Sequence, residues 1–339
     1  MAVDESLAQA SNTLIYSAML VYTGALGAFT TDLALRGRRR VGVPAAVGAP
    51  AGRAVADRVP ATVGAGADAP VDAAPSVPGP PAADPARTRA GGIGVSLTGL
   101  AFLLHAGGVL ARGLSVGRVP WGNMYEFSVA GSVVVTGMFL VVLMRRDVRY
   151  LGTFVIGPVL LTLGLAVAVF YTRADQLVPA LHSFWLLIHV SIAFVASALY
   201  TMGFSTTVLQ LVQERREQAR AAGRAPTRGR FMDALPSSAA LDRSSYSLHV
   251  AAFPLWTFTV VAGAIWAESA WGRYWNWDPK ETWSFVIWVV YAGHLHARAT
   301  RGWDGRKAAY LALAGYACIL MNFMVVNVFF VGRHSYGGL

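Results

Sequence analysis

The chain has 339 residues, of which 55% are hydrophobic and only 14% are charged, and its formal net charge is +10. Its apolar residues fall in long runs rather than at amphipathic spacing, which excludes an ordinary water-soluble domain and indicates a chain embedded largely in a bilayer. The single cysteine, Cys318, excludes a disulfide within the chain and a cysteine-based metal site. Basic residues gather in alternate loops, so the positive charge reflects membrane orientation and no nucleic-acid partner is expected.

Eight apolar stretches approach the length of about 20 residues that crosses a bilayer. They are expected to be helices, because lipid cannot satisfy an exposed backbone. The sequence therefore predicts an all-α, polytopic integral membrane protein with about eight transmembrane helices. The predicted spans are residues 12–34, 92–111, 127–144, 150–171, 184–211, 249–268, 284–300 and 308–331.

The segment after the first span has a different composition. Residues 36–91 are rich in Ala, Pro and Gly, with scattered Arg and Asp, and lack the aromatic and large aliphatic side chains that a core needs. We expect a disordered linker there. It would divide the chain into an N-terminal transmembrane helix at 1–35, the linker at 36–91 and a transmembrane bundle at 92–339.

Charge predicts the orientation of the spans. Most of the 28 Lys and Arg residues lie in segments 36–91, 145–149, 212–248 and 298–307. The positive-inside rule makes these segments cytoplasmic, so both termini and the loop between the sixth and seventh spans would lie outside the cell membrane. No basic segment precedes the first span, and a cleaved signal peptide is not expected.

That external loop is the most distinctive segment of the chain. Residues 270–283 read Ala-Trp-Gly-Arg-Tyr-Trp-Asn-Trp-Asp-Pro-Lys-Glu-Thr-Trp. The segment is too short to bury four tryptophans against itself, so they are expected to cover something large, planar and apolar, such as haem. An aromatic belt alone would populate both membrane faces, whereas most tryptophans of this chain map to the outer one. We refer to residues 270–283 as the Trp-rich loop.

Histidines can supply the axial ligands of a noncovalently held haem. His189 and His334 lie at the outer ends of two different spans, beside the Trp-rich loop, and are candidate axial ligands from opposite sides of one macrocycle. His182 precedes His189 by seven residues and is either an interfacial histidine or an extra ligand. His294 and His296 lie near the cytoplasmic end of the seventh span, on nearly opposite faces of the helix.

These features carry a family resemblance. The Trp-rich loop resembles the "WWD" signature of haem-handling cytochrome c biogenesis proteins, specifically the CcsA/ResC family of system II, called CcsB in actinobacterial-type naming. The resemblance extends from about residue 92 to the end of the chain. Further matching motifs are Trp-Gly-Asn-Met-Tyr-Glu-Phe at 121–127, Leu-Val-Pro-Ala-Leu-His-Ser-Phe-Trp-Leu-Leu-Ile-His-Val at 177–190, Leu-Asp-Arg-Ser-Ser-Tyr at 241–246, His-Leu-His-Ala-Arg at 294–298 and His-Ser-Tyr-Gly at 334–337.

The resemblance implies roles for particular residues. The family's two external haem ligands match His189 and His334, and its intramembrane haem ligand matches His296. The residues that would cover the haem are Trp271, Tyr274, Trp275, Trp277, Asp278 and Trp283, and those that would meet its propionates are Arg273 or Lys280. The chain departs from the family pattern at His182, where Gln is usual, and at Ser247, where Arg is common.

The resemblance also implies a function. The chain would bind b-type haem noncovalently and in transit, deliver it to the outer face, and promote its covalent attachment to the Cys-x-x-Cys-His motifs of apocytochrome c. The partners would be a ResB/Ccs1-type membrane protein and thioredoxin-like proteins that keep the apocytochrome reduced. The complex would act as a cytochrome c haem lyase (holocytochrome c synthase), with no catalytic residue apart from the haem site and no metal other than haem iron. A haem exporter without ligation activity, or a haem b electron-transfer protein, are the alternatives.

Overall fold

The computed structural model describes residues 3–41, 88–175, 183–224 and 230–334. In these ranges the chain consists of helices and loops, without a strand, and it is an all-α polytopic membrane protein as predicted. Most of the predicted linker lies outside the described residues. Within the described ranges, seven helices are long and apolar enough to span a membrane. They are α1 (Glu5–Val41), α2 (Arg89–Val116), α3 (Met124–Arg145), α4 (Gly152–Ala168) with the preceding turn η1 (Arg149–Leu151), α5 (Phe184–Ala221), α6 (Ser238–Trp271) and α8 (Gly305–Leu320) with its extension to Phe329.

The predicted seventh span forms α7 (Pro279–Arg301), a helix of 23 residues. It is not among the seven helices whose length and composition suit a membrane span, and its second half carries His294, His296 and Arg298. It nevertheless packs against both α6 and α8. The eight predicted stretches therefore all form helices, and seven of them satisfy the length and hydropathy of a span.

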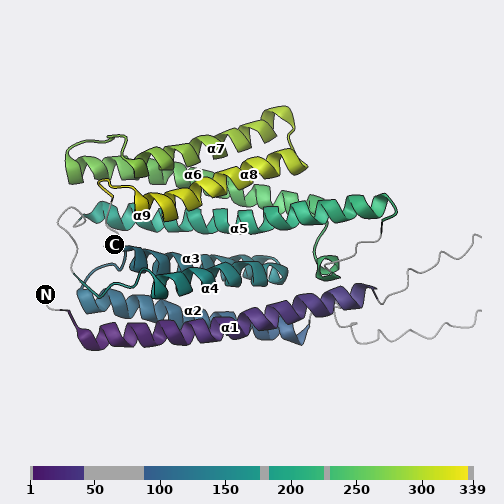
Figure 1. Cartoon of the computed structure of the whole chain (residues 1–339), viewed down its shortest axis with the longest axis horizontal. Helices are drawn as coiled ribbons and strands as arrows, with labels where there is room; N and C mark the ends of the chain where they lie inside the picture. Colours follow the sequence, from purple (N-terminus) through teal and green to yellow (C-terminus); the bar gives the residue numbers. More distant parts are fainter. Residues whose placement is uncertain (1–2, 42–87, 176–182, 225–229, 335–339) are drawn as a thin grey trace, which may run out of the picture.

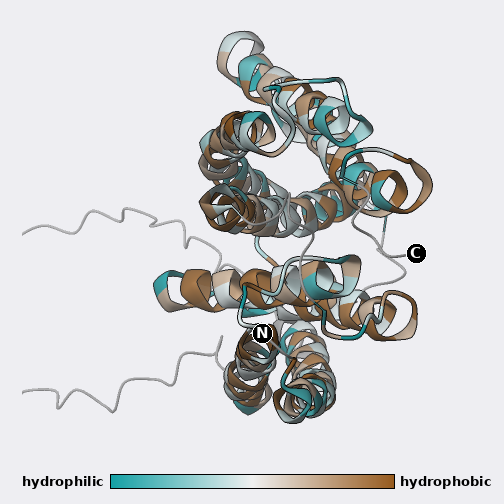
Figure 2. Cartoon of the chain, turned by 90° about the vertical axis from the view of Figure 1, so that its left-hand side faces the viewer, coloured by the Kyte–Doolittle hydropathy of each residue, from teal (hydrophilic) through white to brown (hydrophobic). Residues whose placement is uncertain are grey.

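The helices form two groups that lie side by side (Figures 1 and 2). In one group α1 packs along α2, and α3 and α4 cover them; in the other α5 packs along α6, with α7 and α8 beside them. Contacts of α3 with α5, and of α1 with the turn η3 (Arg230–Ala234) that follows α5, join the groups. Large apolar side chains such as Leu20, Leu103 and Met144 are exposed on the outside of the bundle, which is where lipid tails would contact them.

Helix α5 runs well past its predicted end at residue 211. Its 38 residues correspond to about 57 Å at about 1.5 Å per residue, which exceeds the hydrocarbon thickness of about 30 Å. The extension is held by polar contacts, because Arg216 pairs with Asp233 of η3 (Arg230–Ala234) and Glu214 pairs with Arg306 of α8. The basic segment after the span is thus a continuation of the helix.

A buried charge cluster fastens the loops at the opposite end. Glu126, in the first turn of α3, accepts hydrogen bonds from Nε of Arg112 at 3.0 Å and from Nη1 of Arg118 at 2.7 Å. The guanidinium groups of Arg112 and Arg118 also donate hydrogen bonds to the backbone oxygens of Thr172 and Asp175, respectively. The motif at 121–127 therefore ties together the ends of α2, α3 and α4 on the side where the Trp-rich loop lies (Figure 1).

Candidate functional site

A cavity with a volume of about 630 Å³ lies between the two helix groups. Its lining is mostly apolar and comes from α3 to α8, the Trp-rich loop and the turn η4 (Met321–Val326), which joins α8 to α9 (Asn327–Phe329). Along α5 the lining runs from His189 to Ser205, which is about 24 Å at about 1.5 Å per residue. The cavity thus begins beside the Trp-rich loop and extends deep into the bundle.

His189 and His334 both line this cavity. Their role as ligands of one haem stays a prediction. Nδ1 of His189 donates a hydrogen bond to the backbone oxygen of Thr259 on α6, at 2.9 Å. Since a carbonyl can only accept, Nδ1 carries the hydrogen and Nε2 is left as the atom with a lone pair. The ring of Trp266 lies 5.7 Å from the His189 ring, and Gly263 leaves room for it, because a Cβ there would come within 2.7 Å of Cε1.

His334 is held by the aspartate of the Trp-rich loop. Its Nδ1 lies 3.0 Å from Oδ1 of Asp278, and the backbone N–H of Arg333 donates to Oδ2 of the same carboxylate at 2.7 Å. Burial raises the pKa of Asp278, but the hydrogen bonds from His334, Arg333 and Lys280 outweigh it and lower the pKa to about 2. Asp278 is therefore ionised at neutral pH and accepts the hydrogen from His334.

The same aspartate begins α7. Asp278 is the N-cap residue and accepts from the backbone N–H of Lys280, while the side chain of Glu281 accepts from the backbone N–H groups of Asn276 and Asp278. This is a capping box with proline at the first helical position. Trp277, directly before it, has a positive φ of 55°, which is uncommon for a residue with a side chain. The charged residues of the signature therefore set the path of the loop.

The aromatic residues of the loop do not all face the cavity. Tyr274 and Trp275 line it. Trp271 lies edge-on against His334, with ring centroids 4.8 Å apart. Trp277 is 67% exposed and lies edge-on to Trp275 and to Phe285 of α7, and Trp283 is half-buried; neither lines the cavity.

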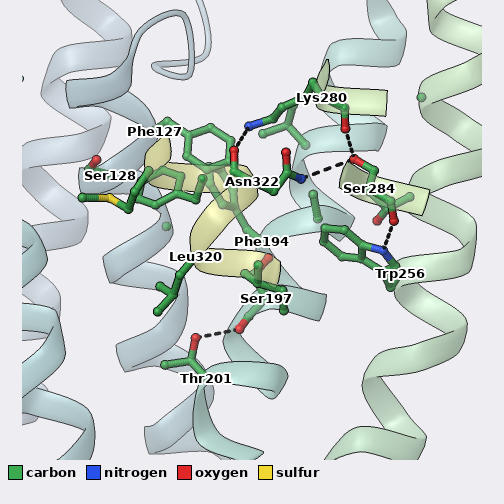
Figure 3. Close-up of a pocket in the computed structure, with 18 of the residues that line it drawn as sticks. Phe127, Ser128, Phe194, Ser197, Thr201, Trp256, Lys280, Ser284, Leu320 and Asn322 are labelled. Carbon is green, nitrogen blue, oxygen red and sulfur yellow. Dashed lines mark hydrogen bonds between the residues drawn. The ribbon is translucent and has the colours of Figure 1, made fainter. Parts of the chain in front are cut away.

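Lys280 lines the cavity as well and contacts the turn after α8 (Figure 3). Its Nζ donates to the backbone oxygen of Asn322 at 3.1 Å and to Oδ1 of Asn327 at 2.8 Å. The accepting turn is π-helical, a form that leaves an irregular backbone and is frequent at functional sites. Arg273, the other candidate for contact with propionates, is exposed, hydrogen-bonds to Asn276 and does not line the cavity.

The histidines of α7 lie on opposite faces, as predicted. His294 is buried, while His296 is exposed on the outside of the bundle, away from the cavity. Arg298 follows His296 by two residues, and its guanidinium group donates to both carboxylate oxygens of Asp242 at 2.8 Å. The motifs at 241–246 and 294–298 thus join α6 to α7 through this ion pair. His182 lies outside the described residues.

Sequence reasoning missed the polar partners of the two cavity histidines, Thr259 and Asp278. The signal for Asp278 was present, since an Asp-Pro followed by Glu at the start of a helix is a capping pattern. The Thr259 contact uses a backbone oxygen and has no signal in the sequence.

The fold and the cavity define a polytopic membrane protein that brings two oriented histidines to an apolar cavity beneath a loop rich in tryptophan. The family described as cytochrome C assembly protein matches residues 121–334. The chain belongs to this family, and its role is in cytochrome c assembly.

The similar proteins described below are all cytochrome c biogenesis proteins, in agreement with this family. The chain is 32% identical over 288 residues to the cytochrome c biogenesis protein CcsA of Synechococcus elongatus. This match covers 72% of the present chain and 87% of the relative. The chain is 30% identical over 305 residues to CcsA of a Picosynechococcus strain, covering 75% and 89%, and 33% identical over 249 residues to CcsA of Guillardia theta, covering 67% and 80%.

Among solved structures, the chain is similar in fold to a protein described as the cytochrome c haem lyase CcmF. The TM-score is 0.57 at 16% sequence identity, and the match covers 96% of this chain and 47% of CcmF. The chain therefore spans about half the length of CcmF, and at this identity the likeness concerns the fold alone.

Proposed function

We propose that this chain is the haem-binding membrane subunit of a system II cytochrome c synthetase, and that its substrate haem binds in the cavity between His189 and His334. The observation that best supports this proposal is that both imidazoles line one cavity and that each is oriented by a hydrogen bond from Nδ1 to an oxygen acceptor. Metal-binding histidines are commonly held in this way, with the remaining ring nitrogen directed to the metal.

The residues of the cavity fit haem. Pockets for small molecules and cofactors usually occupy about 300–1,000 Å³ and are mostly apolar, and this cavity meets both conditions. Trp275 and Tyr274 offer flat faces to a macrocycle, and the ammonium group of Lys280 can meet a propionate through a charge-assisted contact. Because Arg273 lies off the lining, Lys280 is the better candidate for this role.

In this proposal the chain contributes to thioether formation by holding haem in position for the thiols. Haem supplies the vinyl groups, across which the two thiols of a reduced Cys-x-x-Cys-His motif add without net oxidation. His189 and His334 would hold the iron until the apocytochrome histidine replaces one of them. The Trp-rich loop keeps water from the ring and fixes its orientation. No separate general acid or base is required by this scheme.

His296 supports a second, intramembrane contact with haem. An exposed imidazole on a lipid-facing helix is costly unless it meets a partner. Phe285, Val289 and Gly293 share its exposed face at helical spacing, and nothing lies within 4 Å of a Cβ built on Gly293. This flat stripe suits a macrocycle held between α7 and a helix of a ResB/Ccs1-type subunit, which would supply the second ligand.

The proposed orientation places the Trp-rich loop and both termini outside the plasma membrane, where thioredoxin-like reductants would keep the apocytochrome thiols reduced. It is supported by the gathering of Asp4, the loop at 117–123, the Trp-rich loop and His334 at one end of the bundle (Figure 1). The helix at 1–35 and the linker at 36–91 would then precede a haem-handling bundle at 92–339.

The test is the visible spectrum of the detergent-purified chain, alone and with its ResB-type partner. We expect a six-coordinate haem signal that His189→Ala or His334→Ala weakens and that added imidazole restores. Asp304→Ala, which changes an exposed residue at the start of α8 that does not line the cavity, is the control and should leave the signal unchanged. A signal indifferent to His189→Ala and His334→Ala would refute the assignment of the cavity ligands.

A further inference from the structure

One wall of the cavity carries a group of polar side chains, whereas most of the lining is apolar. Lys280 and Ser284 of α7 and Asn322 of the turn η4 lie beside one another on this wall (Figure 3). Trp256 of α6 holds the wall in place, because its Nε1 donates to the backbone oxygen of Ser284 at 3.1 Å. In pockets for small molecules a few placed polar groups fix the orientation of the ligand. This wall is therefore where a polar part of the ligand should bind.

The ammonium group of Lys280 lacks a counter-ion. Its Nζ donates to two neutral oxygens, those of the Asn322 backbone and the Asn327 side chain. Among the described residues no carboxylate forms an ion pair with it. An ammonium group carries three hydrogens, so one remains available. Because a charge in an apolar cavity is costly unless it is paired, this third hydrogen indicates a site for an anion.

The side chain of Asn322 is also incompletely paired. Asn322 is 5% exposed, and its Oδ1 has no hydrogen-bond partner within the described ranges. Its Nδ2 makes one long contact, of 3.4 Å, with Oγ of Ser284 and carries a second hydrogen. Oγ of Ser284 donates to the backbone oxygen of Lys280 at 2.7 Å, so it is an acceptor towards Asn322 and holds the amide beside Lys280. Buried polar groups are nearly always hydrogen-bonded, so this amide indicates a missing ligand.

A carboxylate of haem meets both requirements. Haem carries its propionates at one edge of the macrocycle, and a carboxylate accepts several hydrogen bonds, which the ammonium and amide groups can donate together. The wall also lies next to the candidate iron ligands, because Oδ1 of Asp278 accepts from the backbone N–H of Lys280 and from Nδ1 of His334. A propionate enters an apolar cavity with an apolar ring attached, whereas a free anion would enter it alone.

We propose that Lys280 and Asn322 bind one propionate carboxylate of haem, and that Ser284 is a positioning residue for the Asn322 amide. The cavity then selects a porphyrin with free carboxylates over an esterified one. This inference rests on the proposed function, since it concerns the same cavity, and it adds the specificity of that cavity for its ligand.

Affinities of the full-length purified chain for haem and for haem dimethyl ester, measured by visible titration, test the proposal. The ester has the same ring and iron without a free carboxylate. The unaltered chain should bind haem at least about tenfold more tightly than the ester. Equal affinities would overturn the proposal and leave the haem cavity in place. A six-coordinate signal with neither compound would refute the proposed function as well.

Variants of Asn322 should change the affinity for haem and not the affinity for the ester. Asn322→Asp places a second carboxylate beside the bound propionate, and since like charges repel, haem affinity should fall at least about tenfold. Asn322→Leu removes the amide and should lower haem affinity about threefold. Unaltered binding of the ester shows that both variants fold. An equal loss for the two compounds would mean that Asn322 only supports the turn η4, and would overturn the assignment.

Ser284→Ala should lower haem affinity about threefold, again without an effect on the ester. Ser247→Ala is the matched control. Oγ of Ser247 also donates to the backbone oxygen four residues earlier, that of Arg243 at 2.9 Å, but Ser247 is exposed on α6 and does not line the cavity. If the two serine variants bind haem equally well, Ser284 does not position the amide and that part of the proposal is wrong.

Discussion

Nδ1 of His334 donates a hydrogen bond to Oδ1 of Asp278 at 3.0 Å, and this contact joins the last described residue of the chain to the N-cap of α7. Gly332 allows the chain to approach, since a Cβ there would lie 2.5 Å from Oδ2 of Asp278. One carboxylate thus begins a helix, orients a candidate haem ligand and closes the Trp-rich loop against the C-terminal segment.

Replacing Asp278 tests this arrangement. Removing a partner that orients a metal-bound histidine typically costs about 10–100-fold in affinity, so Asp278→Ala should weaken haem binding by about this factor. Asp278→Asn keeps an oxygen acceptor and should lose less. Haem titration of the purified chain, followed by its visible spectrum, measures both.

The control for Asp278→Ala is Asp304→Ala. Asp304 is also an N-cap aspartate, at the start of α8, but its side chain makes no capping hydrogen bond. If Asp278→Ala binds haem as well as Asp304→Ala does, Asp278 only shapes the loop and has no part in orienting His334.

The position of His189 depends on a glycine of the neighbouring helix. In Gly263→Ala the new methyl group would lie 2.7 Å from Cε1 of His189, so the ring must move away from the backbone oxygen of Thr259. We expect haem affinity to fall at least tenfold. Gly164→Ala, on α4, is the matched control, because nothing lies within 4 Å of its added methyl group. Equal affinity of both variants would mean that His189 is not a ligand in this pose.

The sequence was sufficient to predict the helices and to place His189 and His334 at the same end of the bundle, because span ends on the same membrane face lie together whatever their separation in the chain. That the two histidines pair on one haem stays a prediction. The sequence could not predict which aromatic residues face inward. That choice follows from the capping box at Asp278 and the positive φ of Trp277, which leave Trp275 in the cavity lining and Trp277 exposed beside Phe285 of α7. The end of α5 was also missed, since ion pairs rather than apolar residues hold it beyond the membrane.

Substitutions of Lys280 and Arg273 are expected to differ in their effect on haem affinity, because only Lys280 is placed to contact a propionate. Burial lowers the pKa of Lys280 to about 7, and a propionate beside it would favour the charged form. Lys280→Met removes this amine from the cavity lining, and since a hydrogen bond to a charged group contributes about 1.5–3 kcal/mol, haem affinity should fall at least tenfold. Arg273→Met should have no such effect, because Arg273 lies off the lining. Haem titrations of the two variants measure the difference.

Haem dimethyl ester, which has no free carboxylates, isolates the contact. The unaltered chain and Lys280→Met should bind the ester with similar affinity, and the difference between them should appear only with haem itself. A Lys280→Met variant that loses the same affinity for both compounds would show that Lys280 acts by holding Asn322 and Asn327 in the π-helical turn instead.

Glu126 is expected to be essential for stability rather than for haem binding. Its carboxylate is buried between the guanidinium groups of Arg112 and Arg118, and removing one partner of a buried ion pair costs about 3–5 kcal/mol because the other charge is left uncompensated. Glu126→Ala should therefore lower the thermal midpoint of unfolding sharply, and Glu126→Gln, which keeps an acceptor, should lower it less. Glu268→Ala, at an exposed carboxylate of α6, should leave the midpoint within error. If Glu126→Ala and Glu268→Ala unfold at the same temperature, the charge cluster does not fasten the ends of α2, α3 and α4.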